Sequence, residues 1–177
     1  MLKRLGWGLR RGLLVPIGIE PLGPDRGNEI LNGGFEEPGA GGVDIWADWT
    51  ETVSDGVLTN EVVIVHSGND SCKMTAGVLA DTRVNQLFPV TPLTTHRLIF
   101  WNYGDGVNAG YFHVWDATNG ANIIALTNTG LTAAAWAPYS TEFVIPATCI
   151  SVNFFFRCPN VNGGVCYFDD ADIRAIT

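Results

Sequence analysis

Asn32-Gly33-Gly34-Phe35-Glu36 separates two stretches of different character. Its two glycines allow a backbone that takes positive φ or lies close against another strand. The aromatic ring and the carboxylate that follow suit either a hydrogen-bonded turn with a solvated glutamate or a cation site built from oxygen ligands. We interpret residues 1–27, before this stretch, as an arm. The rest is interpreted as one β domain that closes at Tyr167-Phe168-Asp169-Asp170.

Composition indicates an all-β domain. Of the 177 residues only 16% are charged, whereas 11% are aromatic and 21 residues are glycine. This balance is typical of strands joined by glycine-rich turns. Short apolar runs are separated by turn signals roughly every 8–14 residues, which is the spacing of a sandwich. We therefore predict a jelly-roll β-sandwich of two antiparallel sheets over residues 28–177, preceded by an extended N-terminal arm over residues 1–27.

The net charge of −8 is spread unevenly along the chain. Residues 1–27 contain five basic and two acidic residues, whereas residues 28–177 contain five basic and sixteen acidic ones. An acidic body does not bind nucleic acid by neutralising phosphates, so we expect no nucleic-acid partner. No segment has the ~20 consecutive apolar residues of a membrane helix, so we expect no membrane span.

The arm combines apolar side chains with glycines and prolines that prevent a long helix. A basic, apolar arm on an acidic body indicates a segment that docks on other structural subunits, in a homo-oligomer or an array. The alternative is a tail without contacts. No small-residue cleavage site follows its short apolar run, so we expect the arm to be retained. The anchoring candidates are Trp7, Leu9, Leu13, Leu14, Val15, Ile17 and Ile19.

Local patterns predict particular strands and turns. Val62-Val63-Ile64-Val65 has the apolar pattern of a fully buried strand. Asn119-Gly120 lies between two alternating runs and predicts a β-hairpin. Trp46 and Trp49 are expected to pack in the core or at a sheet edge rather than to form a ligand platform.

Four cysteines are present, and none has the C-x-x-C spacing of a zinc site. Cys158 and Cys166 flank Asn162-Gly163-Gly164, which is a hairpin signal, at symmetric positions. The two residues can therefore face each other across two strands. A disulfide and a pair of packed free thiols both remain open.

No pattern indicates catalysis. Ser67 beside His66 belongs to a turn, and the G-x-S-x-G motif of a nucleophile elbow is absent. The neighbouring acids Asp169 and Asp170 point to opposite faces of a strand, which does not suit a pair of catalytic carboxyl groups. We expect a protein that is not an enzyme.

Short motifs follow one another in a familiar order along residues 28–176. They are Asn32-Gly33-Gly34-Phe35-Glu36, the two tryptophans, His66-Ser67-Gly68, Gln86 before Pro89, Leu98-Ile99-Phe100-Trp101, Trp136 with Tyr139, and Tyr167-Phe168-Asp169-Asp170-Ala171-Asp172-Ile173. This order resembles the carbohydrate-binding modules of the family 4/9/22 type. Those modules share the galactose-binding-domain-like jelly roll, which serves many functions.

The resemblance implies a structural Ca²⁺ between the first and last strands. Glu36, Asp70 and either Asp169 or Asp170 would supply carboxylates, together with backbone carbonyls near Lys73. Such a set of oxygen ligands suits calcium. The alternative is that these residues only cap turns.

The resemblance also implies binding of a polysaccharide or a cell-surface glycan. In such sites aromatic rings stack on the apolar face of a sugar while amides and charged groups bind its hydroxyls. The alternative is that the same side chains contact another protein. The outward-facing candidates are Trp101, Tyr103, Tyr111, His113, Trp115, Phe155 and Arg157.

Two functions are compatible with these observations. The favoured one is a structural or adhesion protein of a phage virion, namely a capsid decoration, head-fibre or tail component. Its jelly roll would be displayed on the virion surface, and its arm would anchor it to neighbouring subunits. This interpretation rests on the arm and on a resemblance to phage structural proteins. The alternative is a free-standing extracellular carbohydrate-binding module.

Overall fold

The computed structural model describes residues 27–158 and 163–176. The predicted anchoring residues of the arm lie outside this part of the chain. Within it there is no helix, and so none that is long and apolar enough to cross a membrane. The strands are β1 (Pro38–Gly41), β2 (Asp44–Trp46), β3 (Thr50–Thr52), β4 (Val57–Glu61), β5 (Ser71–Thr75), β6 (Thr82–Pro89), β7 (Thr95–Tyr103), β8 (Tyr111–Asp116), β9 (Ala121–Asn128), β10 (Trp136–Val144), β11 (Ser151–Cys158) and β12 (Val165–Ala175).

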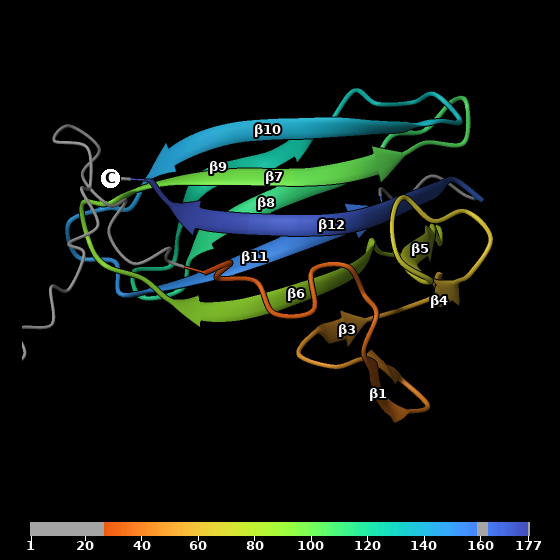
Figure 1. The fold of residues 1–177 in the computed structure, drawn as a ribbon, viewed down its shortest axis with the longest axis horizontal. Helices are drawn as coiled ribbons and strands as arrows, with labels where there is room; N and C mark the ends of the chain where they lie inside the picture. Colours follow the sequence, from red (N-terminus) through yellow and green to blue (C-terminus); the bar gives the residue numbers. More distant parts are fainter. Residues whose placement is uncertain (1–26, 159–162, 177) are drawn as a thin grey trace, which may run out of the picture.

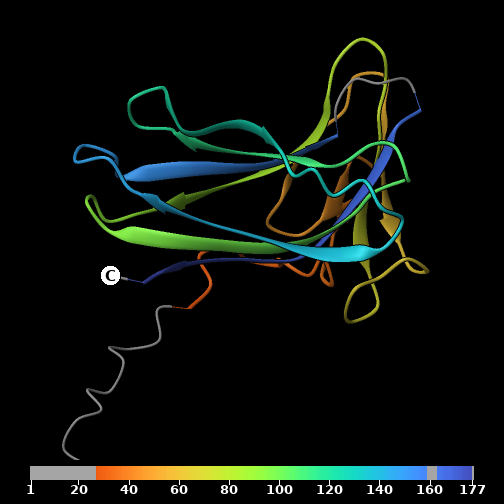
Figure 2. The same ribbon diagram turned by 90° about the horizontal axis from the view of Figure 1, so that it is seen from above.

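Two five-stranded antiparallel sheets form a sandwich (Figure 1). The β7 sheet has the order β10-β7-β12-β5-β4, and the β11 sheet has the order β3-β6-β11-β8-β9. β1 and β2 form a separate two-stranded sheet. Figure 2 shows the sandwich from above, with β7, β10 and β12 in one layer and β6, β8, β9 and β11 in the other. Most neighbouring strands are distant in sequence, as in a jelly roll, so the predicted fold class is confirmed.

The core lies between the two sheets and is mainly aromatic. Phe156 of β11 stacks on Phe168 of β12 with 4.1 Å between ring centroids, and it contacts the edge of Phe100 of β7 at 4.9 Å. Val152, Phe154 and Phe156 alternate along β11 and are fully buried. Since successive strand residues point to opposite faces, the residues between them must face outward.

The segment that opens the domain lies along the last strand. The amide of Ala171 donates to the carbonyl of Gly33 at 2.9 Å, and the amide of Glu29 donates to the carbonyl of Ile173 at 2.7 Å. Two residues after Gly33, Phe35 stacks on Trp49 with 4.9 Å between centroids. The opening motif therefore connects the C-terminal strand to the core.

Two predictions about core aromatics and turns are confirmed. Trp46 and Trp49 are both buried, as core packing requires. β8 and β9 form the predicted antiparallel hairpin, and Gly120 in its turn has a φ of 69°. This left-handed conformation explains the glycine.

The predicted strand Val62–Val65 is wrong. Val62, Val63 and Ile64 form bends after β4, none of the four residues is in a strand, and Val62 and Val63 are 65% and 83% exposed. The side chain of Glu61 accepts a hydrogen bond from the amide of Val63 at 2.9 Å, which turns the chain away from the sheet. The turn carries His66 to Asp169 and Asp170 in the middle of β12, and an apolar run alone does not signal such a departure.

The predicted hairpin between Cys158 and Cys166 is also wrong. Cys158 ends β11 and Cys166 is the second residue of β12, and these strands belong to different sheets, so they do not pair as a hairpin. Both cysteines are buried and free, as are Cys72 and Cys149. The sequence left open a disulfide or a pair of free thiols, and the structure has free thiols. Burial raises the pKa of the Cys72 and Cys166 thiols well above the ordinary value.

Gly33 provides a test of the contact between the first segment and the last strand. A Cβ at this position would lie 2.1 Å from the carbonyl oxygen of Ala171. We expect Gly33→Ala to lower the free energy of unfolding by about 1–3 kcal/mol, because the two backbones must separate. Gly27→Ala is the matched control, since a Cβ there meets nothing within 4 Å. Equal urea midpoints for the two variants would contradict the close approach.

Candidate functional site

The outer face of the β11 sheet gathers aromatic, amide and guanidinium side chains. They lie at outward positions of β6, β8 and β11, between core residues on the opposite face. We call this set the polar-aromatic face. It consists of Arg83, Asn85, Tyr111, His113, Trp115, Asn153, Phe155 and Arg157.

Strand register places Phe155 at the centre of this face. Its neighbour across β6 is Asn85, and its neighbour across β8 is His113. Two residues further along β11, Arg157 lies directly opposite Arg83. One aromatic ring therefore has amide, imidazole and guanidinium groups on adjoining strands.

Ring contacts hold Phe155 in place. The imidazole of His113 stacks on it with 5.2 Å between centroids. The guanidinium carbons of Arg157 and Arg83 lie 5.0 Å and 5.9 Å from its centroid. Cations at these distances are attracted to the ring. Phe155 is only half-buried, so part of its ring faces solvent.

Two further aromatic residues extend the face along β8. Trp115 lies opposite Asn153 of β11 and contacts the edge of His113 with 5.7 Å between ring centroids. Tyr111 lies at the other end of β8, and its hydroxyl accepts a hydrogen bond from Asn128 of β9 at 2.9 Å. Both are half-buried. The rings thus follow β8 with polar groups beside them.

His113 is neutral and positions its neighbours. Its Nε2 lies 2.6 Å from Oδ1 of Asn122, and its Nδ1 lies 3.5 Å from a terminal nitrogen of Arg157. Arginine only donates, so Nδ1 accepts and Nε2 carries the proton. Burial lowers the pKa of His113, and the positive charge of Arg157 lowers it further. His113 is buried and contacts Asn122, Arg157 and Phe155, so it helps to fix the positions of these three side chains.

The seven predicted glycan residues do not form one site, which corrects the prediction. Five of them, on β8 and β11, lie on the polar-aromatic face. Trp101 and Tyr103 lie on β7, in the other sheet, and point outward on the opposite side of the sandwich. Outward side chains were assigned correctly, but the pattern of one strand does not show to which sheet it belongs.

Trp101 and Tyr103 have structural contacts of their own. The ring of His66 stacks on Trp101 with 3.7 Å between centroids. Tyr103 contacts the edges of Trp136 and Tyr167 at 5.6 Å and 5.2 Å. The loop that carries His66 therefore covers part of the β7 sheet.

Sequence reasoning missed Arg83, Asn85 and Asn153. Arg83 and Asn85 alternate along β6 with buried Val84 and Gln86. The side chain of Asn85 donates to that of Asn153 across the two strands at 3.1 Å. The alternation of these residues with buried ones indicated that they face outward. Only the pairing of β6 with β11 shows that they lie beside Phe155.

The predicted calcium residues lie around the loop between β4 and β5. Glu36 accepts hydrogen bonds from the amides of Asn69 and Asp70 at 2.9 Å and 3.1 Å. Asp70 itself accepts from the side chain of Asn60 at 2.8 Å. Both carboxylates therefore fix turns in this structure.

The two aspartates of β12 bind the beginning of the same loop. Asp169 accepts from the amides of His66 and Ser67 at 2.9 Å and 3.2 Å. Asp170 lies 2.6 Å from Nδ1 of His66 and accepts from the Ser67 hydroxyl at 2.8 Å. Burial raises the pKa of Asp169 to about 6; hydrogen bonds from the backbone oppose this rise, and the neighbouring Asp170 adds to it.

The fit of these residues to calcium is partial. Within residues 27–158 and 163–176, no three His, Cys, Asp or Glu side chains are grouped to hold a metal ion. Yet a Cβ built on Gly34 would lie 3.5 Å and 3.9 Å from carboxylate oxygens of Asp170 and Asp169 and 3.7 Å from Cγ of Glu36, so the side chains of three acidic residues adjoin one glycine. The calcium site therefore stays a prediction, together with the alternative of turn caps.

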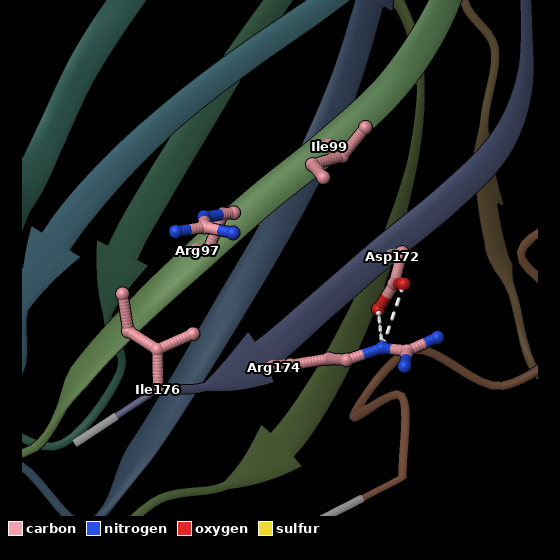
Figure 3. A pocket seen from close by; sticks show the side chains of 5 residues that line it. All are labelled: Arg97, Ile99, Asp172, Arg174 and Ile176. Atoms are coloured by element: carbon pink, nitrogen blue, oxygen red, sulfur yellow. Dashed lines mark hydrogen bonds and ion pairs between the residues drawn. The ribbon is translucent and has the colours of Figure 1, made fainter.

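A pocket on the β7 sheet offers a different chemistry (Figure 3). It has a volume of about 260 Å³ and lies between β7 and the end of β12. Its carboxylate, Asp172, is paired with Arg174 at 2.7 Å, and its apolar lining is Ile99 and Ile176. It has no aromatic ring for a sugar to stack on, which makes it a weaker candidate than the polar-aromatic face.

Comparison with solved structures defines the class of fold. The resemblance found in the sequence is confirmed at this level, since the chain has the jelly roll of carbohydrate-binding modules. No protein-family model matches the sequence, and no curated protein matches it either.

Three solved structures illustrate the similarity. A family 4 carbohydrate-binding module matches with a TM-score of 0.62 and 18% identity over 82% of this chain and 99% of that one. A family 61 module in complex with beta-1,4-galactotriose has a TM-score of 0.58 and 17% identity over 84% and 98%. The enzymatically active domain of bacteriophage CBA120 tailspike protein 4 has a TM-score of 0.60 and 16% identity over 84% of this chain but only 21% of that one.

Calcium provides a test of the carboxylate site. We expect added CaCl₂ to raise the melting temperature relative to EDTA, because a bound ion stabilises the folded state by about 2.7 kcal/mol at a hundredfold excess over Kd. Glu36→Gln should reduce the shift, whereas Glu37→Gln, an exposed neighbour, should leave it unchanged. Identical melting curves in calcium and EDTA would contradict the calcium site and support the alternative that these carboxylates only cap turns.

Proposed function

We propose that this chain is a carbohydrate-binding module whose polar-aromatic face binds a polysaccharide or a cell-surface glycan. One observation carries the proposal. Half-buried Tyr111, Trp115 and Phe155 lie beside amides and guanidinium groups on one sheet face. The solved carbohydrate-binding modules with the same fold support it. They favour this function over the virion component that the sequence favoured.

The chemistry of the face suits sugar recognition. Exposed ring area at Phe155 and Trp115 can stack on the apolar face of a pyranose. Asn85 and Asn153 are bonded to each other through one donor and one acceptor. Each amide therefore has hydrogen-bonding capacity left for sugar hydroxyls. The role is binding without catalysis.

The face is also organised before any ligand arrives. Asn128 holds the hydroxyl of Tyr111, and Asn122 holds His113. Side chains that are already fixed lose less conformational entropy when a ligand binds. This favours recognition of an extended polymer by a rigid surface.

Substitution of the aromatic rings tests the proposed face. We expect Trp115→Ala or Phe155→Ala to abolish retention in gels that contain the bound polysaccharide, since stacking area is lost while the core stays intact. Trp101→Ala is the matched control, because Trp101 lies on the other sheet. Retention of the two face variants at the wild-type level, with circular dichroism unchanged, would refute the assignment.

A role in a virion remains a second candidate. The observation in its favour is the tailspike protein of a bacteriophage, part of which has this fold. In this proposal residues 1–27 anchor the domain to neighbouring structural subunits, and the jelly roll is displayed on the virion surface. Glycan binding and display are compatible, since a displayed module can attach a particle to a cell surface.

Truncation tests the anchoring role. We expect the full chain to form a defined oligomer and a chain starting at Asn28 to be a monomer, because the apolar arm supplies the contacts between subunits. Size-exclusion chromatography with light scattering measures both masses. Two monomers would remove the arm from assembly and leave the glycan-binding proposal untouched.

A further inference from the structure

We infer that the polar-aromatic face takes an anionic glycan, whose carboxylate or sulfate group is bound by Arg83 and Arg157. This inference rests on the proposed glycan binding and adds the chemical class of the ligand. It is carried by the placement, pairing and burial of the two guanidinium groups.

The two arginines lie directly opposite each other on neighbouring strands. Arg83 of β6 pairs with Arg157 of β11 in the antiparallel register, and both point outward. Like charges in this arrangement destabilise a sheet. Residues 28–177 hold five basic and sixteen acidic residues, so two of the scarce positive charges are placed side by side. An anion between them would remove the repulsion.

Within the described part of the chain, Arg83 is the one basic residue to which no carboxylate is paired. Each of the other four has its own partner, at 2.7 Å to 3.2 Å. These pairs are Lys73 with Glu61, Arg97 with Glu142, Arg157 with Asp81, and Arg174 with Asp172. Arg83, the basic residue without a carboxylate partner, therefore lies on the polar-aromatic face.

Both guanidinium groups have a buried nitrogen without a partner. Nε of Arg83 and Nε of Arg157 are inaccessible to solvent and make no hydrogen bond. Unsatisfied buried donors are rare in proteins and often mark a functional site. Two of them on facing residues form an unusual arrangement, and because both Nε atoms are closed to solvent, an anion would bind the terminal nitrogens of these groups.

The neighbouring acidic residues do not supply acceptors for these two Nε atoms. Asp81 accepts a hydrogen bond from a terminal nitrogen of Arg157 at 2.8 Å, and Nε is not part of this contact. Glu51 lies opposite inward-facing Val84 and accepts the amide of Trp46 at 2.9 Å. Asp116 is buried and caps the turn after β8. The other polar neighbours, Thr52 opposite Arg83 and Tyr111 and His113 beside Arg157, carry no negative charge.

The geometry suits a sugar that carries a negative group. Both guanidinium groups lie within 6 Å of the Phe155 centroid, at 5.0 Å and 5.9 Å, so a ring stacked on Phe155 would place its substituents beside them. Arginine binds carboxylate and sulfate oxygens through parallel N–H donors. A neutral sugar would offer only hydroxyls to two positive charges.

Matched polysaccharides test the inference. The probes are polygalacturonate with its carboxyl-reduced form, and dextran sulfate with dextran, measured by isothermal titration calorimetry on the full chain. We expect one anionic member to bind at least about tenfold more tightly than its neutral counterpart, and the affinity to fall with added salt. The pair that shows the difference identifies a carboxylate or a sulfate.

Variants locate the effect. Arg83→Gln should weaken binding of the anionic polymer about tenfold and leave the neutral one unchanged. Arg97→Gln, which removes a charge from the other sheet, should change neither. Arg83→Lys should retain part of the charge effect, and it replaces the glutamine variant if that one does not fold.

Two outcomes overturn the inference in different ways. Equal binding of neutral and anionic polymers, with Arg83→Gln unchanged, refutes the anionic ligand and leaves glycan binding in place. Binding of no polysaccharide across these probes and a broad glycan panel refutes the proposed function itself, and the inference fails with it.

Discussion

The stacking of Phe156 on Phe168 joins the two sheets and sets the orientation of β11. A strand shifted by one residue would turn its buried face to solvent and its outer face into the core. Phe156 is completely buried, where it packs against Phe154 of its own strand and against Phe100 and Phe168 of the β7 sheet. Its neighbours Phe155 and Arg157 must therefore face outward. The candidate site is thus a direct consequence of the packing of the core.

Charge is divided between two parts of the domain. Carboxylates gather around the loop between β4 and β5, where Glu36, Asp169 and Asp170 fix its backbone and side chains. The facing pair of guanidinium groups lies on the opposite sheet. In a body with a large excess of acidic residues, two guanidinium groups thus lie side by side, and only Arg157 has a carboxylate partner, Asp81, among the described residues. The overall charge of the chain is therefore a poor guide to the chemistry of its face.

The sequence predicted what depends on local pattern. Alternation predicted the strand that carries Trp115, and Asn119-Gly120 predicted its hairpin with the next strand. Sheet membership depends on crossovers between distant segments, so Trp101 was grouped with residues on the other sheet. The pairing of Arg83 with Arg157 was missed for the same reason. Short motifs were sufficient to predict the fold. Which residues form the candidate site could be determined only from the pairing of the strands in the structure.

The close association of residues 28–33 with β12 has a consequence for how the domain is presented. Asn28 binds the backbone of Ala171 and Ile173, so the first and last described segments are held together at one end of the sandwich, as Figure 2 also shows. Anything joined to the chain before or after the domain would leave from that end. The broad outer surface of the β11 sheet would then stay unobstructed. In the proposed glycan-binding role, an attachment at that end would not stand between the outer surface of the β11 sheet and a polymer that lies on it.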